Sequence, residues 1–334
     1  MKPTLKQIAN EAGVSVSTAS RILRGDSKRD SKNVQRVMEA AKRLNYPVQA
    51  KFASPFYDET NHLMVALITH FHTGEFYASL FHGMDEAARE AGFKLSLFHS
   101  ESDAESIIAF IQELSFKSYD AAILFLPMLS EEDYREIQEQ CPEEFTIISA
   151  AAVVNPVLDT VSFDSYRGGH YAGKHFEEHG YKDVGVVLGS TNRNESLLRK
   201  SGFTDFVDHH SNMNLVWQFI GDYTVESGRK AYRDYRRKRK KPRAIFLSND
   251  YMTLGFMEEA RRDGVIIPEQ VALVGYDDLP ICSYHYPSIS SIHTDYKKLG
   301  TSAINLIRDK IKSGEPHQGL LNIVPVNLKE RQSS

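Results

Sequence analysis

The sequence predicts a small all-α head joined to an α/β body of two lobes, each built on a doubly wound parallel sheet. Three observations predict this organisation. Helical spacing with a tight glycine turn fills residues 1–46, residues 47–61 form a linker with two prolines, and from residue 62 apolar runs alternate with helical stretches. Such alternation is typical of parallel βαβ units. The 334 residues are enough for two or three domains.

The composition is that of an ordinary globular protein. Hydrophobic residues make up 41% and charged residues 25% of the chain. No apolar run approaches the roughly 18 residues of a membrane span, and "MKPTLKQIANEAG" lacks the apolar region of a secretory signal. The two cysteines, Cys141 and Cys282, lie far apart without metal-type spacing. We therefore expect a cytoplasmic protein with no membrane partner.

The net charge of −4 is unevenly distributed along the chain. Residues 1–51 carry eleven Lys and Arg against four Asp and Glu, a balance of +7, so the remainder has a balance of −11. A basic head on an acidic body indicates a polyanion-binding module joined to another function. Charge alone does not separate this interpretation from a solvated basic face.

Local signals divide the head into helices. Thr4 and Gln7 match a capping box. Gly13 lies where a turn needs a positive φ, and Ser15 is placed to cap a second helix. Apolar residues at helical spacing follow each start. The expected helices span about 5–12, 15–23 and 33–44, and three short helices with a tight turn between the first two form a helix-turn-helix.

The second helix has an unusual outward face. Val14, Ala19 and Ile22 fill the small core, whereas the opposite side carries small hydroxyls and arginine instead of Glu and Lys. Short side chains let the backbone approach DNA, hydroxyls donate or accept hydrogen bonds, and arginine reaches a guanine edge or a phosphate. The face is therefore predicted to enter a major groove. The alternative is a generic three-helix cap.

The stretch "TLKQIANEAGVSVSTASRIL", followed by "VQRVMEAAKRLNY", resembles the DNA-binding head of the lac-repressor/gal-repressor (LacI/GalR) family of bacterial transcription regulators. The resemblance implies that Thr4, Leu5 and Ser15 contact the phosphate backbone. It also implies that Val16 and Ser17 read bases, with Arg21 as a further groove contact. The full set expected at DNA is Thr4, Leu5, Ser15, Val16, Ser17, Thr18, Ser20, Arg21 and Arg24.

The linker departs from the family pattern. In the family this region forms a hinge helix on DNA, and its leucine wedges into the minor groove. Here Pro55 stands at the leucine position, and proline inside a helix is costly. Three alternatives remain open: Phe52 or Phe56 acts as the wedge, the head needs no ordered hinge, or these phenylalanines pack against the body.

Polar side chains follow several predicted strands of the body, where doubly wound sheets bind ligands. Asn249 and Asp277 are expected to contact a ligand, whereas Asp250 is expected to cap the next helix. Asp277 and Asp278 point to opposite faces of a strand, which argues against a shared acid–base pair. With the aromatics Phe76 and Tyr77, these groups suit a polyhydroxylated ligand.

The resemblance extends through the body to about residue 328, where the family core is similar to periplasmic sugar-binding proteins. It implies that Arg199 and Asp277 are polar anchors and that Tyr223 stacks on the ligand, whereas Ala150 stands where the family often has an aspartate. The implied effector set is His70, Phe76, Tyr77, Arg199, Tyr223, Asn249, Tyr251, Asp277 and Thr294. The expected body spans 62–334, with lobe 1 at about 62–160 and 290–318 and lobe 2 at about 161–289 and 319–330.

These observations predict a ligand-responsive regulator, a repressor of carbohydrate-utilisation genes whose DNA affinity is switched by a small sugar or sugar derivative. One head contacts few base pairs, so we expect a homodimer on a pseudo-palindromic double-stranded operator. Helices near 77–91 and 105–114 are candidates for the dimer surface. The alternative is a cytoplasmic sugar-binding or sugar-processing protein whose head has lost its DNA role.

The sequence lacks the motifs of several enzyme classes. We find no phosphate loop, Rossmann fingerprint, Gly-x-Ser-x-Gly elbow or zinc-protease motif, so no enzyme activity and no cofactor are expected. His62, His70, His72 and His82 are close in sequence but lack cysteine or clustered carboxylate partners. No metal site is therefore expected.

Overall fold

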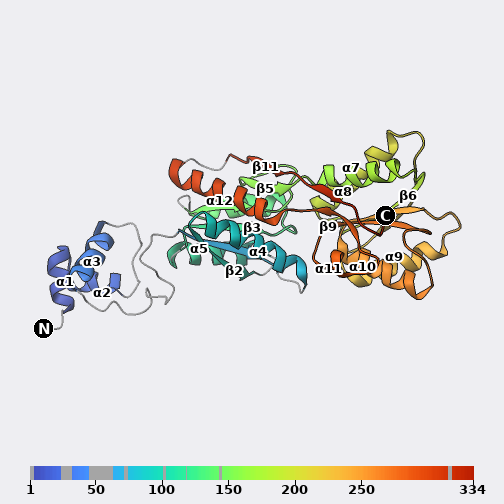
Figure 1. The fold of residues 1–334 in the computed structure, drawn as a ribbon. Coiled ribbons are helices and arrows are strands. Elements are labelled where there is room, and N and C mark those ends of the chain that lie inside the picture. Colours follow the sequence, from blue (N-terminus) through green and yellow to red (C-terminus); the bar gives the residue numbers. More distant parts are fainter. Residues whose placement is uncertain are drawn as a thin grey trace. The chain divides into compact units, whose positions relative to one another are not determined.

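The computed structural model describes residues 4–23, 32–44, 63–70, 74–100, 103–117, 119–142, 145–314 and 318–334 (Figure 1). Its contacts divide the chain into two compact units. One holds the N-terminal helices, and the other holds almost all residues from Met64 onward. The predicted linker 47–61, with Phe52, Pro55 and Phe56, lies outside the described residues, as do Arg24, His62 and His72.

The head contains α1 (Leu5–Ala12), α2 (Val16–Leu23) and α3 (Lys32–Arg43). The predicted capping box is confirmed: Thr4 is the N-cap of α1, and Gln7 bonds back to the Thr4 backbone. Gly13 has a φ of 65°, as the turn requires. The second cap is confirmed too, because Thr18 N donates to Ser15 Oγ over 3.1 Å. One apolar cluster joins the helices: Ile8, Ala9, Ala12, Ala19, Ile22, Leu23, Val37, Ala40 and Ala41.

The first lobe of the body is a six-stranded sheet in the order β11-β5-β4-β3-β1-β2. The pairs that join β1, β3, β4, β5 and β11 are parallel. Its helices pack on both faces, so the inner strands β1, β3, β4 and β5 are mostly buried, whereas the edge strand β11 is mostly exposed. The elements are β1 (Leu63–Thr69), α4 (Glu75–Glu90), β2 (Phe93–His99), α5 (Ala104–Lys117), β3 (Ala121–Phe125), α6 (Glu131–Gln140), β4 (Thr146–Ser149), β5 (Thr160–Phe163), α12 (Tyr296–Ser313) and β11 (Leu321–Val324).

The second lobe repeats this plan with the order β12-β10-β9-β8-β6-β7. Its pairs are parallel except that β10 and β12 are antiparallel. The elements are α7 (Ser165–Glu178), β6 (Asp183–Leu188), α8 (Asn194–Asp208), β7 (Asn214–Ile220), α9 (Val225–Arg237), β8 (Ala244–Leu247), α10 (Asp250–Arg262), β9 (Ala272–Asp277), α11 (Ile281–Tyr284), β10 (Ser290–His293) and β12 (Asn327–Lys329). The predicted pair of doubly wound lobes is confirmed.

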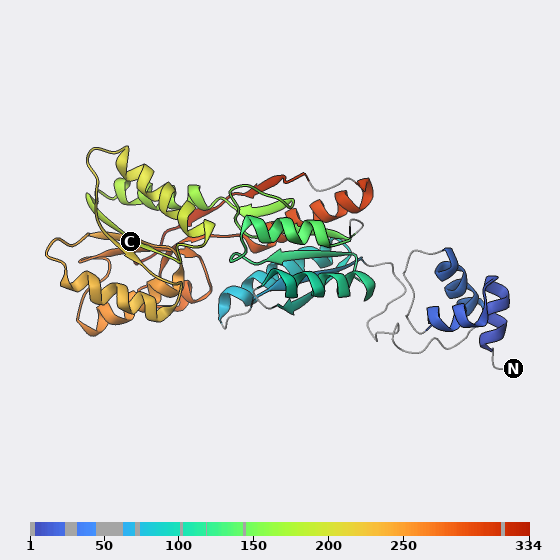
Figure 2. The ribbon, with the colours of Figure 1, turned by 180° about the vertical axis from the view of Figure 1, so that it is seen from behind.

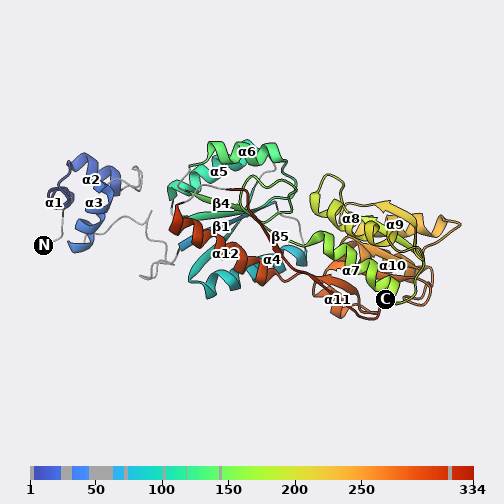
Figure 3. The ribbon, with the colours of Figure 1, turned by 90° about the horizontal axis from the view of Figure 1, so that it is seen from above.

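Each sheet lies between two layers of helices, which Figure 3 shows for the first lobe and Figure 1 for the second. In the first lobe, α5 and α6 cover one face, and α4 packs with α12 on the other. In the second lobe, α7 and α8 cover one face, and α9 and α10 the other. Gly169 and Gly202 let α7 and α8 approach closely, because a Cβ at either position would overlap the backbone of the other helix.

The strand membership differs from the lobe limits expected from the sequence. β5 (Thr160–Phe163) pairs with β4 and β11 in the first sheet, although the expected second lobe began at residue 161. β10 pairs with β9 in the second sheet, and β11 belongs to the first. A strand's apolar pattern shows that it is buried but not which sheet it joins. The chain therefore passes between the sheets three times, after β5, β10 and β11 (Figures 1 and 2).

None of the described helices is both long and apolar enough to cross a membrane.

Candidate functional site

The first candidate surface is the outer face of α2 in the head. Ser15 anchors this face, because its Oγ lies 2.9 Å from Ser17 Oγ and 2.7 Å from Thr18 Oγ1. Val16 at the helix start is 43% exposed. The face thus presents an exposed valine beside a row of ordered hydroxyls.

The structure places the predicted DNA-binding residues on both sides of the first turn. Thr4, Ser15, Val16 and Ser17 are exposed; Leu5, Thr18 and Ser20 are half-buried. Arg21 lies in α2, but its side chain is not described, and Arg24 lies outside the described residues. The inner side of α2 is occupied by Ala19, Ile22 and Leu23, all buried in the core of the head. The opposite side is therefore the one available to a major groove.

The second candidate site is a cavity of about 710 Å³ between the two sheets of the body. This volume is within the ordinary range for a small-molecule site. Residues from both lobes line it: Gly74, Phe76, Tyr77, Phe125, Pro127, Ala150, Ala151, Ala152, Ser162, Phe163, Ser165, Arg193, Glu195, Arg199, Asp222, Tyr223, Thr224, Val225, Asn249, Tyr251 and Asp277.

The wall from the first lobe is mainly apolar and aromatic. Phe76 lies in the first turn of α4, its ring centroid 5.2 Å from that of Tyr77 and 5.7 Å from that of Phe125. Phe163, at the end of β5, and Ala150, after β4, continue this wall. Flat aromatic rings of this kind cover the C–H face of a sugar or stack on another planar ligand. The predicted departure at Ala150 thus lies on the cavity wall.

The wall from the second lobe carries the charge. Arg199 projects from α8, is 7% exposed, and donates through Nη1 to the Ser248 carbonyl. Its Nη2 lies 3.6 Å from Asp277 Oδ1, and its guanidinium lies 3.5 Å over the Tyr276 ring. Burial opposes the charged form, but Tyr276 and Asp277 raise the pKa of Arg199 overall. The guanidinium is thus a fixed positive group, and its Nε has no hydrogen-bond partner among the described residues.

Asp277 is held in an uncommon backbone conformation. Its φ is 108°, and Tyr223 on the same wall has a φ of 70°. Such values are rare outside glycine and persist where the surroundings enforce them, often at ligand sites. Thr294 Oγ1 donates to the Asp277 carbonyl over 2.9 Å. Burial raises the pKa of the Asp277 carboxyl, and Arg199 opposes that rise.

The capping roles of Asn249 and Asp250 differ from the prediction. Asn249, not Asp250, is the N-cap of α10, because its side chain accepts from Met252 N over 2.9 Å. Its amide also donates to the Tyr223 carbonyl over 2.9 Å, which holds Tyr223 in place. Asp250 is buried behind the wall and accepts from Leu279 N and Ser291 Oγ. A cap depends on backbone direction, which the residue order alone does not give.

Two residues of the predicted effector set do not line the cavity. His70 follows β1, with Nδ1 3.2 Å from the Ser100 carbonyl and its ring 5.3 Å from that of His99. Thr294 lies behind Asp277, as described above. The other predicted residues, Phe76, Tyr77, Arg199, Tyr223, Asn249, Tyr251 and Asp277, all line the cavity.

The sequence interpretation missed a second charged pair at the cavity. Arg193 Nη1 lies 3.9 Å from Glu195 Oε1, and the guanidinium lies 5.3 Å from the Tyr223 ring centroid. Burial raises the pKa of Glu195, and Arg199 and Arg193 oppose that rise. Both residues follow the carboxyl end of β6, the same signal that identified Asn249 and Asp277. The cavity therefore offers paired donors and acceptors opposite an aromatic wall.

Comparisons with known proteins agree with this architecture. The model of "Bacterial regulatory proteins, lacI family" matches residues 4–48, and that of a "Periplasmic binding protein-like domain" matches residues 173–334. The chain is 27% identical to the ribose operon repressor of Escherichia coli (strain K12), covering 99% of both chains. It is 26% identical to the HTH-type transcriptional repressor PurR of Edwardsiella ictaluri (strain 93-146), covering 99% of this chain and 96% of that protein.

Solved structures show the same fold. The lac repressor dimer bound to operator and the anti-inducer ONPF matches with a TM-score of 0.75 at 20% identity, covering 100% of this chain and 99% of that one. A complex of the transcriptional regulator CelR with cellobiose matches with a TM-score of 0.71 at 23% identity, covering 99% and 100%. Residues 4–48 thus match the lacI family of bacterial regulatory proteins, and the chain combines a helix-turn-helix head with a periplasmic-binding-protein-like body.

Proposed function

We propose that this protein represses carbohydrate-utilisation genes and that a small sugar or sugar derivative in the body cavity switches its affinity for operator DNA. The outer face of α2, with residues Thr4, Leu5, Ser15, Val16, Ser17, Thr18, Ser20, Arg21 and Arg24 around it, is the proposed DNA contact. The cavity is the proposed effector site, with Arg199 and Asp277 as polar anchors and Tyr223 as the stacking ring.

The construction of the cavity is the observation that carries the sugar assignment. Its first-lobe wall holds Phe76 and Phe125, and its second-lobe wall holds the buried Arg199–Asp277 pair. A carboxylate accepts from neighbouring hydroxyls, a guanidinium donates to them, and aromatic rings cover the apolar face of a pyranose or furanose. An unpaired Arg199 Nε adds a donor to which a hydroxyl oxygen would bond.

Relatives support the same assignment. The chain resembles a ribose operon repressor, and solved neighbours include complexes with cellobiose and with D-xylulofuranose. The resemblance to a lac repressor dimer on operator supports a homodimer that reads a pseudo-palindromic site. A protein that binds an operator must reach the chromosome. The proposed function therefore includes the cytoplasmic location that the sequence predicts.

The proposed switch uses the three chain segments that connect the lobes, after β5, β10 and β11. A ligand held between both walls favours one arrangement of the lobes over another, and a few kcal/mol of differential affinity is enough to shift such an equilibrium. In this proposal the cavity binds the sugar and does not convert it chemically. The switch requires only that the bound ligand and the operator change each other's affinity for the protein.

The test is fluorescence anisotropy of the full chain on labelled duplexes tiled from the DNA upstream of its gene. Titrations near physiological salt are run with and without a panel of galactosides, glucosides and pentoses. We expect tight binding to one duplex that one sugar changes by at least tenfold. Tight binding that no sugar alters would refute the effector assignment. Sugar binding by a folded dimer that binds no duplex would refute the repressor and favour a sugar-binding protein.

Two neighbouring aspartates provide matched variants for this test. The Asp277 and Asp278 side chains are buried to a similar extent, 6% and 8% exposed. Asp278 points away from the cavity, since it pairs with Arg331 at 2.7 Å and His293 at 2.9 Å. Asp277→Asn is expected to abolish the sugar response and retain operator binding, whereas Asp278→Asn retains both. An equal loss in the two variants would assign the effect to folding.

A further inference from the structure

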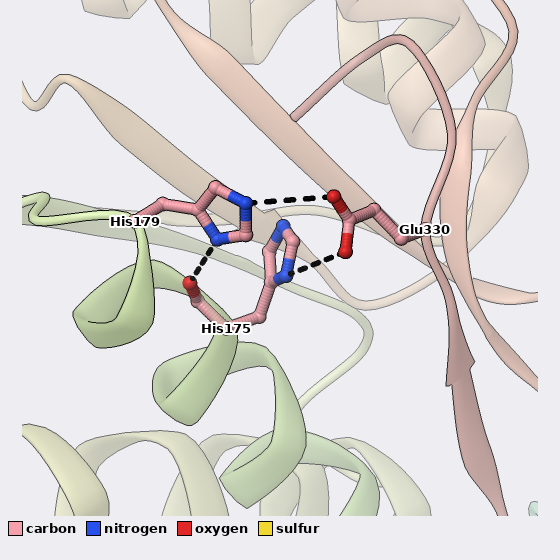
Figure 4. Close-up of side chains that lie close together, drawn as sticks. All are labelled: His175, His179 and Glu330. Atoms are coloured by element: carbon pink, nitrogen blue, oxygen red, sulfur yellow. Dashed lines mark hydrogen bonds and ion pairs between the residues drawn. The ribbon is translucent and has the colours of Figure 1, made fainter.

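Two histidines and a glutamate of the second lobe converge (Figure 4), and none of them lines the cavity. His175 and His179 lie one turn apart at the end of α7, and Glu330 follows β12. One ligand atom from each lies within 4.8 Å of the others. It is the one such group of three His, Cys, Asp or Glu in the part of the chain that the structure describes.

The hydrogen bond of His179 fixes which ring nitrogen faces the glutamate. Nδ1 lies 2.9 Å from the His175 carbonyl, which only accepts, so Nδ1 carries a proton. In the neutral ring, Nε2 then bears a lone pair. That atom lies 3.4 Å from Glu330 Oε1. A lone pair against a carboxylate is unfavourable, so this contact requires either a proton on Nε2 or a cation bound between the two atoms.

His175 approaches the same carboxylate from a buried position. The side chain is 3% exposed, and its Nδ1 lies 3.9 Å from Glu330 Oε2. Its Nε2 lies 2.8 Å from Ser334 Oγ. Burial lowers the pKa of His175, and the neighbouring His179 lowers it further, although Glu330 opposes the shift. Ring nitrogens of the two histidines and the carboxylate of Glu330 thus face one another within 4.8 Å.

We propose that His175, His179 and Glu330 bind a divalent transition-metal ion, with Zn²⁺ the best match to the donors. Imidazole nitrogen and carboxylate oxygen are its common ligands, and two histidines at i and i+4 of a helix can share one ion. Ligand atoms around tetrahedral zinc lie about 3.3 Å apart, given Zn–N distances near 2.05 Å. The 3.4 Å between His179 Nε2 and Glu330 Oε1 meets this spacing, whereas His175 Nδ1 lies 3.9 Å from the other carboxylate oxygen, Oε2, and must move closer for all three residues to share one ion.

The surroundings also match those of a metal site. Metal-bound histidines commonly donate their second ring N–H to a carbonyl or another oxygen, and both rings have such a contact: His179 with the His175 carbonyl and His175 with Ser334 Oγ. The side chains of His179 and Glu330 are 39% and 56% exposed, which leaves room for a water as fourth ligand. The ion would tie the segment after β12 to α7 and stabilise the second lobe.

The test is zinc competition with a chromophoric zinc indicator, using the full chain freed of metal by a chelator. We expect one Zn²⁺ per chain at micromolar affinity or tighter. His179→Ala and Glu330→Gln should each weaken binding at least tenfold. His209→Ala is the matched control, because His209 ends α8 with Nδ1 2.6 Å from the Asp205 carbonyl but lies outside the cluster.

Thermal melting gives a second readout. Zinc should raise the midpoint of the wild type and of His209→Ala, and should leave that of His179→Ala unchanged. Absence of stoichiometric binding, or equal affinity in His179→Ala, Glu330→Gln and the wild type, would overturn the proposal. Circular dichroism of each variant shows whether it is folded. No DNA or sugar enters these measurements, so their outcome is independent of the proposed function.

Discussion

The two proposed recognition surfaces are built in opposite ways. The outer face of α2 is made by residues within six positions of one another, Ser15 to Thr18 and Ser20, whose short side chains are exposed or half-buried. The cavity collects side chains from Phe76 to Asp277, a span of about two hundred positions, and its central pair, Arg199 and Asp277, is buried. Each design suits a different partner.

The difference follows from what each partner brings. A DNA duplex is stiff and highly charged, so the protein needs only a fitting face and leaves its polar groups in water until they meet bases or phosphates. A small ligand buries few atoms, so the protein must hold its polar groups in place beforehand. Substitutions in the cavity should therefore alter stability as well as binding, whereas substitutions of exposed side chains on α2, such as Ser17, should alter DNA binding alone.

The largest expected effect comes from breaking the buried pair. Arg199→Met removes the partner of Asp277, and an uncompensated buried charge typically destabilises a protein by about 3–5 kcal/mol. Urea unfolding should show a lower free energy of unfolding, with a larger deficit at pH 8 than at pH 5, because burial raises the pKa of Asp277 and protonation relieves the charge.

The double variant Arg199→Met with Asp277→Asn is the control for this prediction. It should recover much of the lost stability, because neither charge is then buried alone. A double variant as unstable as Arg199→Met would show that packing around the guanidinium, not the pairing, is what matters.

The second prediction concerns Asp250 behind the cavity wall. Burial raises its pKa from 3.8 to about 7, although Ser291 and Leu279 N oppose the rise. Between pH 3.8 and about pH 7 the folded protein binds a proton on Asp250 that the unfolded chain does not bind. The contribution of Asp250 to stability is therefore complete below about pH 4 and is lost as the pH rises through 7. The change is on the order of a few kcal/mol.

Asp250→Asn tests this prediction by removing the titration while it keeps the shape of the side chain. Urea midpoints measured from pH 4 to pH 8 should fall less steeply in Asp250→Asn than in the wild type. Asp295→Asn serves as the contrast, because a hydrogen bond from Lys298 N lowers the pKa of Asp295 despite its partial burial. Asp295→Asn should instead change the urea midpoint mainly at the acidic end of this pH range. Parallel profiles for Asp250→Asn and the wild type would contradict the prediction.

The third prediction concerns base reading by α2. Ser17→Ala removes an exposed hydroxyl and slightly favours the helix, so the protein should remain as stable as the wild type. Its affinity for the operator identified by the tiling experiment should fall by about 1–3 kcal/mol, the typical value of one base-pair mismatch. Anisotropy on duplexes substituted one base pair at a time should show lost discrimination at one position per half-site. Unchanged discrimination everywhere would remove Ser17 from the base-reading set.

The same contrast explains which features the sequence could predict. The α1 cap at Thr4, the turn at Gly13 and the buried side of α2 all depend on residues within a few positions of one another, and each is confirmed. The sheet that β5 joins depends on pairing between Ser149 and Thr160 and on the later strand β11, and the prediction was wrong there.

The cavity residues could be predicted from the sequence only in part. Asp277 was predicted from its place at a strand end and Arg199 from the resemblance, and both line the cavity. The place of Thr294 behind the Asp277 carbonyl depends instead on a turn with positive φ that no sequence pattern indicates. Asn249 lines the cavity, as expected of a ligand contact, and it also caps α10 and holds the Tyr223 carbonyl. Arg193 and Glu195 follow the end of β6, just as the predicted residues follow the ends of other strands. The same sequence signal therefore predicts Arg193 and Glu195 when it is applied to every strand.

The smallest expected effect separates a cap from a DNA contact. Thr4→Ala and Ser130→Ala each remove a capping box, one from α1 in the head and one from α6 in the body. Each should lower the local stability of its helix by about 1 kcal/mol, measured by hydrogen exchange of the first-turn amides. Only Thr4→Ala should also weaken operator binding, because Thr4 is proposed to contact a phosphate. If the two variants bind the operator equally well, Thr4 acts as a cap alone, and the proposed contact surface begins at Ser15.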